Sequence, residues 1–406
     1  MKLACVVQRY GATITGGSES HCRELAERLA SRHDVHVLTS CATDYVHWHN
    51  TLSPGWSTEG RVRVRRFPVV RPRNLHTFAE LSERAFARRH TPDDERAWFA
   101  ANGPEVPELV SYLDAHGGDY DLILFWAFRY YPSLFGLPVV AERAVLVPTA
   151  EEDAVLDFAV LGDYFRLPRG YIFLTDEERQ LVTSRAGGAT GPSTVIGTGL
   201  EPAAPVSREI LAPLEIVDPY VVYVGRVDRN KGCERLVDYF IRYQDHAARA
   251  VTLVLAGPVH TTLPSHPRVR VLGFVPNDTR DALLTHARAL VMPSPYESLC
   301  IALLEAWNRA LPALVNARCS VLKGQVERAR GGLHYATYRE FASGLSWLLD
   351  HPDGARQFGQ QGLAYVEREY RWPTVMERVE DLLAEVQRRP AVAGEGAARR
   401  VGPAAP

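Results

Sequence analysis

The feature that most limits how this chain can fold is a regular alternation of short apolar segments with amphipathic, helix-like stretches. Strands that alternate with helices form βαβ units, and such units build a mainly parallel sheet. In the first half of the chain we predict strands over residues 2–7, 35–38, 61–70, 122–125, 144–147 and 171–174. The chain is therefore expected to belong to the α/β class.

A Pro- and Ala-rich stretch over residues 202–219 separates this first series of strands from a second one. That composition is typical of an interdomain linker. Beyond it we predict strands over 220–224, 252–256, 269–272 and 289–292, with helices over 233–245, 279–287 and 302–306. The sequence therefore predicts two doubly wound units in succession.

The limits of the domains follow from this pattern. We expect a first doubly wound domain over 1–203, a second over 204–372, a C-terminal helix over 373–389 and a disordered tail over 390–406. Apolar residues recur at helical spacing in the C-terminal helix, whereas the tail is rich in Ala, Gly, Pro and Arg. Residues 71–108, rich in Arg, Pro and acidic side chains, are expected to form an exposed helical insertion.

The charge balance and the cysteine pattern exclude several classes of protein. The 406 residues include 46 Lys and Arg against 48 Asp and Glu, and a net charge of −2 argues against non-specific nucleic-acid binding. The six cysteines form no CxxC pair, which argues against a zinc framework or a disulfide scaffold and favours a reducing compartment. Because no signal-peptide pattern and no apolar run of about 18 residues occur, we expect a cytoplasmic protein without a transmembrane segment.

Three motifs lie where a predicted strand passes into a helix, and the first is the pair Gly16-Gly17. It separates the strand 2–7 from a helix that is predicted to begin at Ser18. Glycine permits close backbone approach, and the free N–H groups of a helix N-terminus attract phosphate. A simple tight turn explains such a pair about as well, so this motif alone does not fix a role.

The second motif is Gly225-Arg226 followed by Lys231-Gly232, directly after the predicted strand 220–224. Ligands of open α/β sheets bind at the carboxyl ends of the strands, where Arg226 and Lys231 would lie. Arg holds a phosphate through two parallel hydrogen bonds, and Lys adds a compact positive charge. A solvated basic turn is the alternative for any single cation, but this spacing at a strand end favours an anion site.

The third motif is a Pro-bounded loop over residues 293–300, between a strand and the helix 302–306. The amides of Ser298, Leu299 and Cys300 would point out of the helix N-terminus. A diphosphate is stabilised at such a position by the free N–H groups and the helix dipole.

Two glutamates accompany this loop. Glu297 lies at its mouth, where a carboxylate can accept hydrogen bonds from sugar hydroxyls. Glu305 lies among Ala302, Leu303 and Leu304, and a carboxylate buried there needs a partner. A ribose diol and a neighbouring Arg are the two candidates for that partner.

Together these motifs resemble those of the retaining glycosyltransferases of family four, the glycogen-synthase-like or group 1 glycosyltransferases. The E-x7-E spacing of Glu297 and Glu305, the G-R-x4-K-G motif and the early glycine pair carry the resemblance, which spans nearly the whole chain. It implies the GT-B fold, in which two Rossmann-like domains face each other across a cleft and the last helix crosses back. Residues 1–203 would bind the acceptor and residues 204–372 the nucleotide sugar.

The resemblance also implies a role for each motif residue. Arg226 and Lys231 would bind the donor diphosphate and stabilise the charge that develops as it leaves. Glu297 would hold hydroxyls of the transferred sugar, and Glu305 would hold the nucleotide ribose. No metal ion is expected, because the basic pair and the helix dipole take its place. The remaining donor contacts that the resemblance implies are at Gly16, Gly17, Gly225, Ser298, Leu299 and Cys300, with the nucleobase at Phe274 and Val275.

One position departs from the family pattern. Family members carry a His after the strand that ends here at Val147, and the best alignment places Glu151 there. Without that His, the leaving phosphate would take the acceptor proton on the same face of the sugar, or the acceptor would need little deprotonation, as a sulfur nucleophile does. A solvated helix start over 151–153 is the simpler interpretation of these acidic residues.

Two further groups of residues have both a chemical and an ordinary interpretation. His47 and His49 resemble a metal-binding pair, but two histidines on an aromatic loop are more often surface residues. The arginines of 61–66 suit an anionic acceptor, but a solvated strand face is favoured for them.

We expect a retaining glycosyltransferase that moves a sugar from a UDP- or GDP-sugar to an acceptor, with no cofactor beyond that donor. The Arg-, Ala- and Gly-rich composition suggests a GC-rich bacterial source, and a small molecule of secondary metabolism, such as an antibiotic precursor, is favoured as acceptor. An envelope glycan or lipid acceptor, a catalytically silent nucleotide-sugar binder that regulates a partner, an epimerase and a phosphorylase are the alternatives. The sequence leaves the sugar, the acceptor atom and the oligomeric state open.

Overall fold

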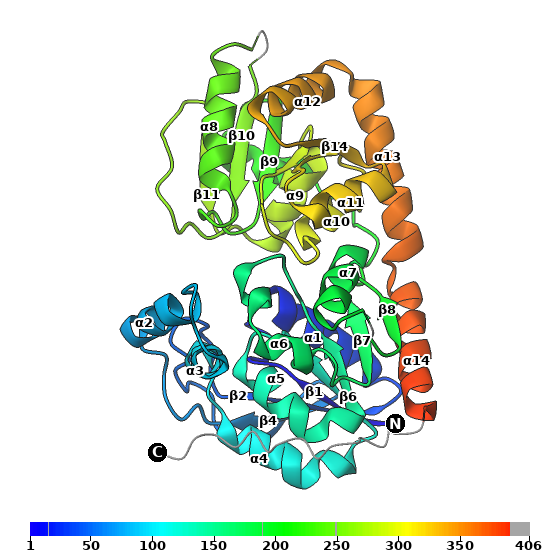
Figure 1. Ribbon diagram of the computed structural model, residues 1–406. Helices are drawn as coiled ribbons and strands as arrows, with labels where there is room; N and C mark the ends of the chain where they lie inside the picture. Colours follow the sequence, from blue (N-terminus) through cyan, green and yellow to red (C-terminus); the bar gives the residue numbers. More distant parts are fainter. Residues whose placement is uncertain (15, 189, 248–249, 390–406) are drawn as a thin grey trace.

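The computed structural model describes residues 1–389 except 15, 189 and 248–249. Figure 1 shows two sheets, each flanked by helices, in the upper and lower halves of the molecule. A helical path along one side, drawn in orange and red, joins the two halves. The predicted α/β class with two parallel-rich sheets is confirmed.

The first sheet has eight strands in the order β3-β4-β2-β1-β5-β6-β7-β8. Every neighbouring pair is parallel except β3 with β4. β5 has the sequence Leu-Ile-Leu-Phe-Trp and is buried throughout, as expected for a parallel strand covered on both faces. The strands are β1 (Lys2–Val6), β2 (Asp34–Ser40), β3 (Gly55–Glu59), β4 (Val62–Phe67), β5 (Leu122–Trp126), β6 (Ala144–Val147), β7 (Gly170–Phe173) and β8 (Ser193–Val195).

The helices of this half begin with ordinary capping chemistry. Thr91 and Asp94 form a reciprocal capping box at the start of α3, and the Thr175 hydroxyl accepts the Glu178 N–H at the start of α7. The α-helices are α1 (Gly17–Leu29), α2 (Leu75–Ala85), α3 (Pro92–Asn102), α4 (Pro107–His116), α5 (Tyr131–Gly136), α6 (Val160–Tyr164) and α7 (Asp176–Arg185).

The second sheet has six parallel strands in the order β11-β10-β9-β12-β13-β14. β9 and β12 are neighbours, so the loops that follow them emerge at the same edge of the sheet. The strands are β9 (Tyr220–Val224), β10 (Thr252–Ala256), β11 (Val269–Gly273), β12 (Leu290–Met292), β13 (Ala313–Asn316) and β14 (Gly332–Tyr335). The helices are α8 (Cys233–Gln244), α9 (Asn277–His286), α10 (Ile301–Trp307), α11 (Ser320–Ala329) and α12 (Tyr338–Asp350).

Two C-terminal helices, α13 (Pro352–Glu369) and α14 (Trp372–Arg388), lead from the second sheet back to the first (Figure 1). α14 packs against β7 and β8, and its apolar face, including Val379 and Leu383, is fully buried. The N–H of Leu200 donates to the carbonyl of Tyr370 at 2.7 Å, which fixes the chain between the two sheets beside this helix pair. The tail predicted over 390–406 lies outside the described residues.

Three sequence-based expectations need correction. β3 was not predicted: its residues are mostly exposed, and only antiparallel pairing with β4 makes this segment a strand. The linker 202–219 contains a 3-10 helix, Arg208–Leu214, with Leu211 buried, so it is partly packed onto the second sheet's helices. The insertion 71–108 is helical, but Trp98 and Phe99 are buried, so it is not wholly exposed.

The arginines of β4 are not a uniformly solvated face. Arg66 is buried and forms an ion pair with Glu59 of β3, while its guanidinium also donates to the Ser57 hydroxyl at 2.7 Å. Arg63 and Arg65 lie over the ring of Trp56. The added strand β3 therefore supplies partners for these cations, which the sequence pattern alone did not indicate.

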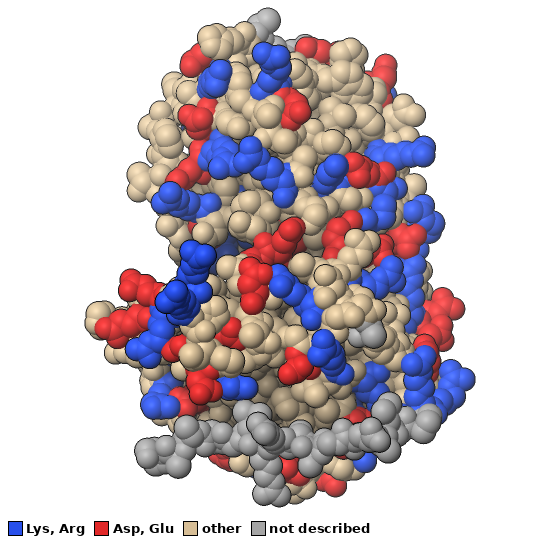
Figure 2. All heavy atoms as spheres, in the orientation of Figure 1, with Lys and Arg blue, Asp and Glu red and all other residues tan. Residues whose placement is uncertain are grey.

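Surface charge and cysteine state agree with the composition. Figure 2 shows Lys and Arg interspersed with Asp and Glu over the face in view. All six cysteines are free thiols and buried. No helix within the described residues is long and apolar enough to cross a membrane.

Candidate functional site

The turn after β9 is held by short-range hydrogen bonds. Gly225 has a φ of +148°, and a Cβ there would lie 2.9 Å from the Tyr223 hydroxyl. That hydroxyl donates to the carbonyl of Arg226 at 2.7 Å, and the Asp228 carboxylate accepts the Lys231 N–H at 2.7 Å. Glycine is needed at 225 because the backbone conformation and the tyrosine leave no room for a side chain.

Lys231 and Glu297 meet at this edge of the sheet. The Lys231 Nζ lies 2.9 Å from the Glu297 Oε1, and it also donates to the carbonyl of Tyr296 at 3.4 Å. Their side chains are 22% and 12% exposed. They come from the loops after the neighbouring strands β9 and β12, so two motifs that are 66 residues apart in the chain form one charged site.

Glu151 faces this pair from the other sheet. Burial raises the pKa of Glu151, the positive charge of Lys231 lowers it, and the negative charge of Glu297 raises it further, with a net upward direction. Burial lowers the pKa of Lys231, but Glu297 and Glu151 raise it, and the net direction is also upward. Two carboxylates and one ammonium group therefore lie within electrostatic reach of one another. The predicted helix start follows Glu151 as a short 3-10 helix capped by Asp153.

Arg226 points toward the first sheet. Its Nη1 donates to the Tyr45 hydroxyl at 3.4 Å, and its Nη2 lies 3.6 Å from the Asp228 carboxylate. Tyr45 belongs to the loop after β2, so this contact joins the two halves of the molecule. Arg226 and Lys231 thus lie on one loop, but Arg226 reaches Tyr45 in the first half, whereas Lys231 binds Glu297 in the second half.

The loop before α10 is also tied to both halves. Cys300, the N-cap of α10, has a φ of +65°, and Leu299 and Cys300 are buried. The Thr175 hydroxyl, at the start of α7, donates to the carbonyl of Ser298 at 3.2 Å. The Gln325 side-chain amide donates to the carbonyl of Leu299. With their carbonyls bound in this way, the peptide groups of this loop have a fixed orientation.

A ribose diol and a neighbouring Arg were the two partners considered for Glu305 from the sequence, and the structure places an Arg beside it. Its carboxylate lies 3.4 Å from the Arg280 Nη2. Burial raises the pKa of Glu305 and the Arg280 charge lowers it, with a net upward direction. Arg280 also pairs with Asp281, so the guanidinium is shared between two carboxylates.

The remaining predicted contacts lie at other strand and helix ends. Gly16 and Gly17 lie at the start of α1, where the carbonyl of Gly16 accepts the Ser20 N–H at 2.8 Å. A Cβ on Gly16 would lie 2.4 Å from the Glu19 carboxylate, so the glycine makes room for that side chain. Phe274 is exposed and Val275 half-buried, directly after β11.

Sequence reasoning missed the buried ion pair beside this glycine turn. Arg9 and Glu19 are both buried, and the Arg9 Nε donates to the Glu19 Oε1 at 2.9 Å. The Arg9 Nη1 also donates to the carbonyl of Thr43 at 2.7 Å. A Glu in the first turn of a helix is such a common feature that nothing in the sequence indicated a partner ten residues earlier.

Glu178 is a second group that the sequence did not reveal. Its two carboxylate oxygens accept the N–H groups of Ala150 at 2.7 Å and Leu174 at 2.6 Å. It lines a pocket between the halves together with Ala150, Tyr296 and Glu297. Burial raises the pKa of Glu178 to about 8, although these backbone N–H groups lower it. Glu178 therefore binds the backbone next to Glu151 and positions that loop.

Comparison with known proteins agrees with this architecture. The family described as Glycosyl transferases group 1 matches residues 209–364. The chain is 28% identical over 414 aligned residues to the alpha-maltose-1-phosphate synthase of Mycolicibacterium smegmatis, which covers 95% of this chain and all of that protein.

Two solved structures are similar over nearly the whole chain. One is the sucrose-phosphate synthase from Thermosynechococcus elongatus, with a TM-score of 0.70 and 18% identity over 95% of this chain and 98% of that one. The other is HepE from Anabaena in complex with UDP and glucose, with a TM-score of 0.68 and 14% identity over 95% of this chain and all of that one. The fold of the chain is therefore that of these proteins.

Proposed function

We propose that the chain is a group 1 glycosyltransferase of the GT-B fold, which moves a sugar from a UDP- or GDP-sugar to a small-molecule acceptor with retention of configuration. The observation that carries this proposal is the contact of Lys231 with Glu297 at the carboxyl ends of β9 and β12, with Arg226 on the same loop. Two cations and a carboxylate at one sheet edge fit a diphosphate joined to a polyhydroxylated sugar.

Lys231 and Arg226 bind the diphosphate in this proposal. An ammonium group has three N–H donors, and Glu297 with the Tyr296 carbonyl uses only part of that capacity. As the bond to the sugar breaks, negative charge grows on the diphosphate, and the two cations stabilise it more strongly than in the ground state. This charge complementarity lets the reaction proceed without a divalent cation at the diphosphate.

Glu297 and Glu305 bind the two sugars of the donor. Glu297, at the rim beside Lys231, accepts hydroxyls of the transferred sugar, while Glu305 accepts the ribose hydroxyls. Arg280 contacts the Oε1 of Glu305 at 3.4 Å, and a carboxylate has about four acceptor positions, so Glu305 retains acceptor capacity for the ribose. The HepE structure, which contains UDP and glucose, supports UDP as the first donor nucleotide to test.

Glu151 approaches from the acceptor side of the cleft. Burial raises the pKa of Glu151, and its carboxyl group can form a hydrogen bond with a hydroxyl of the donor sugar. In the retaining, same-face route, the leaving phosphate accepts the acceptor proton, so no further general base is required. This route is compatible with the absence of a His at this position and suits a sulfur as well as an oxygen acceptor.

The test is a transfer assay on the full chain with UDP- and GDP-sugars and a panel of sugar and thiol acceptors. The proton–proton coupling of the anomeric centre in the product gives its configuration. A product with the configuration of the donor supports the proposal, and an inverted product contradicts retention. Donor conversion without an acceptor would instead indicate an epimerase, and tight nucleotide binding without any turnover would indicate a silent binding protein.

Glu297→Gln separates the role of the sugar-binding carboxylate from folding. We expect nucleotide affinity to stay within about threefold while transfer falls at least tenfold, because the amide loses one hydrogen-bond acceptor facing the sugar. Glu209→Gln, at an exposed position in the 3-10 helix before β9, is the matched control and should change neither. Equal loss of binding and transfer in Glu297→Gln would contradict the assignment.

A further inference from the structure

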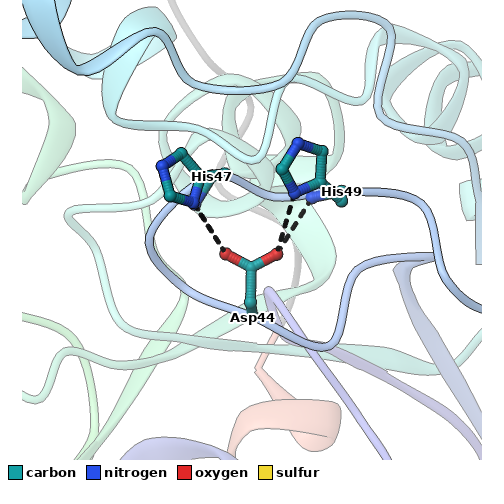
Figure 3. Close-up of side chains that lie close together, drawn as sticks. All are labelled: Asp44, His47 and His49. Atoms are coloured by element: carbon teal, nitrogen blue, oxygen red, sulfur yellow. Dashed lines mark hydrogen bonds and ion pairs between the residues drawn. The ribbon is translucent and has the colours of Figure 1, made fainter.

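Asp44, His47 and His49 form a compact cluster on the loop after β2 (Figure 3). One possible ligand atom from each side chain lies within 4.8 Å of the other two. The Nδ1 atoms of His47 and His49 lie 3.9 and 3.8 Å from the two Asp44 oxygens. From the sequence the two histidines are expected to be ordinary surface residues. The fold places the Asp44 carboxylate between them, and this third possible ligand favours a metal site instead.

The Asp44 carboxylate is held in place by the backbone of its own loop. Its Oδ1 accepts the N–H groups of Val46 at 3.0 Å, His47 at 2.6 Å and Trp48 at 3.3 Å, and its Oδ2 accepts that of His49 at 3.1 Å. Each carboxylate oxygen has about two acceptor positions, and the Oδ2 accepts only this one backbone N–H group among the hydrogen bonds described, so it retains one position for a further ligand.

The backbone that carries the histidines is also fixed. Trp48, between them, is buried, has a φ of +63° and donates its indole N–H to the carbonyl of Asn102 at 2.8 Å. The carbonyl of His47 accepts the N–H of Arg73 at 2.6 Å. Binding a ligand here requires only rotation of two imidazole rings and no folding of the loop, so the entropic cost is small.

The two imidazole rings are accessible and lie face to face. Their centroids lie 5.3 Å apart with an interplanar angle of 27°. Side chains of His47 and His49 are 46% and 61% exposed. Both rings are therefore open to an ion that enters from the solvent.

The types of ligand atom indicate which metal ion fits this cluster. Two imidazole nitrogens and one carboxylate oxygen suit Zn²⁺ and other late divalent metals, whereas Mg²⁺ and Ca²⁺ prefer sites made of oxygen alone. Zn–N and Zn–O bonds of about 2.0–2.2 Å place neighbouring ligand atoms roughly 3.3–3.5 Å apart. The observed separations, of up to 4.8 Å, need to shrink by at most about 1.5 Å, which rotation of the exposed rings provides. The six cysteines, all buried, do not compete for the ion.

We propose that Asp44, His47 and His49 bind one Zn²⁺ ion, with water in its fourth coordination position. The site is separate from the diphosphate-binding residues, and its existence does not depend on the proposed function. Its loop carries Tyr45, whose hydroxyl contacts Arg226 across the cleft. A bound ion would therefore hold rigid the part of the first half that meets the second.

The test measures metal binding by the full chain, freed of metal with a chelator and without any nucleotide. Zn²⁺ is titrated in competition with a chromophoric chelator, and Co²⁺ replaces it for absorption spectroscopy. We expect one equivalent of Zn²⁺ and an intense visible Co²⁺ band of a four-coordinate site. His47→Ala and His49→Ala should each weaken binding at least tenfold, and the double variant should bind no ion at this site.

His76→Ala is the matched control, because His76 is an exposed histidine of α2 with an acidic neighbour, Glu80, at 3.5 Å. It should bind Zn²⁺ as the unchanged chain does. The proposal is overturned if the unchanged chain takes up no Zn²⁺, if the double variant binds as tightly as the unchanged chain, or if all the histidine variants weaken binding equally. Circular dichroism of each variant excludes loss of folding as the cause.

Discussion

Each half of the molecule has an ion pair at the turn after the first strand of its sheet, and the two pairs differ in exposure. In the first half, the side chains of Arg9 and Glu19 are 7% and 6% exposed, beside the start of α1. In the second half, Lys231 and Glu297 are roughly two to three times as exposed, at the edge that faces the first sheet. The two ion pairs therefore occupy similar positions in similar folds but differ in how far their charges are shielded from solvent.

The partners of the two pairs explain the difference. The Glu19 carboxylate also accepts the Ser18 hydroxyl at 2.8 Å, and Arg9 also binds the Thr43 carbonyl, so both charges are satisfied within the first half. Lys231 donates to one carboxylate, that of Glu297, and to one backbone carbonyl, so its ammonium group keeps unused hydrogen-bonding capacity. The comparison teaches that a buried ion pair with all its hydrogen bonds made, such as Arg9 with Glu19, stabilises a turn. The partly exposed pair of Lys231 and Glu297, called the half-open pair below, lies at the same place in its own sheet and can bind an anionic substrate.

The largest effect is expected for Arg9→Met. Removing one partner of a buried ion pair leaves Glu19 charged and unpaired, which costs about 3–5 kcal/mol in the free energy of unfolding. Denaturant unfolding followed by circular dichroism measures this loss. Arg23→Met, which breaks an exposed pair with Glu27 in the same helix, should cost less than about 1 kcal/mol. If the two variants lost equal free energy of unfolding, the Arg9–Glu19 pair would stabilise the fold no more than an exposed pair does, which would contradict its assigned role.

Lys231→Ala tests the half-open pair. Loss of a charge that stabilises the departing diphosphate should lower kcat/KM for the donor by about 10²–10³-fold, with little change in stability. Steady-state kinetics and a melting curve measure both quantities. Arg229→Ala removes a nearly fully exposed cation two residues earlier and should leave kcat/KM within about twofold. A loss of stability in Lys231→Ala as large as in Arg9→Met would contradict the assigned difference.

The variant Glu178→Gln tests whether the position of the loop that carries Glu151 depends on the buried carboxyl group of Glu178. An amide can accept only one of the two N–H bonds that Glu178 now receives, so we expect a loss of about 1–3 kcal/mol in the free energy of unfolding. The KM for the donor should rise more than kcat falls, because Glu151 is displaced and not removed. Glu142→Gln, on the surface, should change neither stability nor KM.

The pH dependence of stability provides the most specific effect, because it comes from one buried carboxyl group. Burial raises the pKa of Glu178 from 4.5 to about 8, so the folded state binds more protons than the unfolded chain between these values. The free energy of unfolding therefore falls as pH rises through this range, by up to about 1.4 kcal/mol per pH unit, and the slope from this group vanishes above about pH 8. Unfolding curves at several pH values should show a shallower fall in Glu178→Gln; an unchanged slope would contradict this origin.

Much of the fold could be predicted from the sequence because parallel strands covered on both faces are continuous apolar runs. β1, β5 and β9 have this pattern and lie within one residue of their predicted limits. β3 does not: its Gly-Trp-Ser-Thr-Glu sequence is polar and exposed, and its conformation depends on the partner strand. Local patterns thus revealed these buried strands but missed the exposed edge strand β3 and also the short buried strand β13, for which no strand was predicted.

The same distinction holds for the candidate site. Arg226, Lys231 and Glu297 could be placed at strand ends because each directly follows an apolar run, and βαβ topology brings such ends together. The roles of Glu178 and Asp44 could not be predicted, since one lies in an ordinary helical first turn and the other in a loop. Their significance comes from backbone N–H groups and side chains that only the folded chain brings near.

The central claim, that the half-open pair and Arg226 form a diphosphate site, is tested most directly by calorimetric titration of UDP, GDP, ADP and TDP without divalent metal. We predict saturable binding of one of these nucleotides to the full chain. Arg226→Ala should weaken that binding by about 10–100-fold, the equivalent of a lost charged hydrogen bond of about 1.5–3 kcal/mol, and Arg229→Ala should not. If folded protein binds none of the four, or if the two arginine variants lose affinity equally, the edge formed by β9 and β12 is not the donor site.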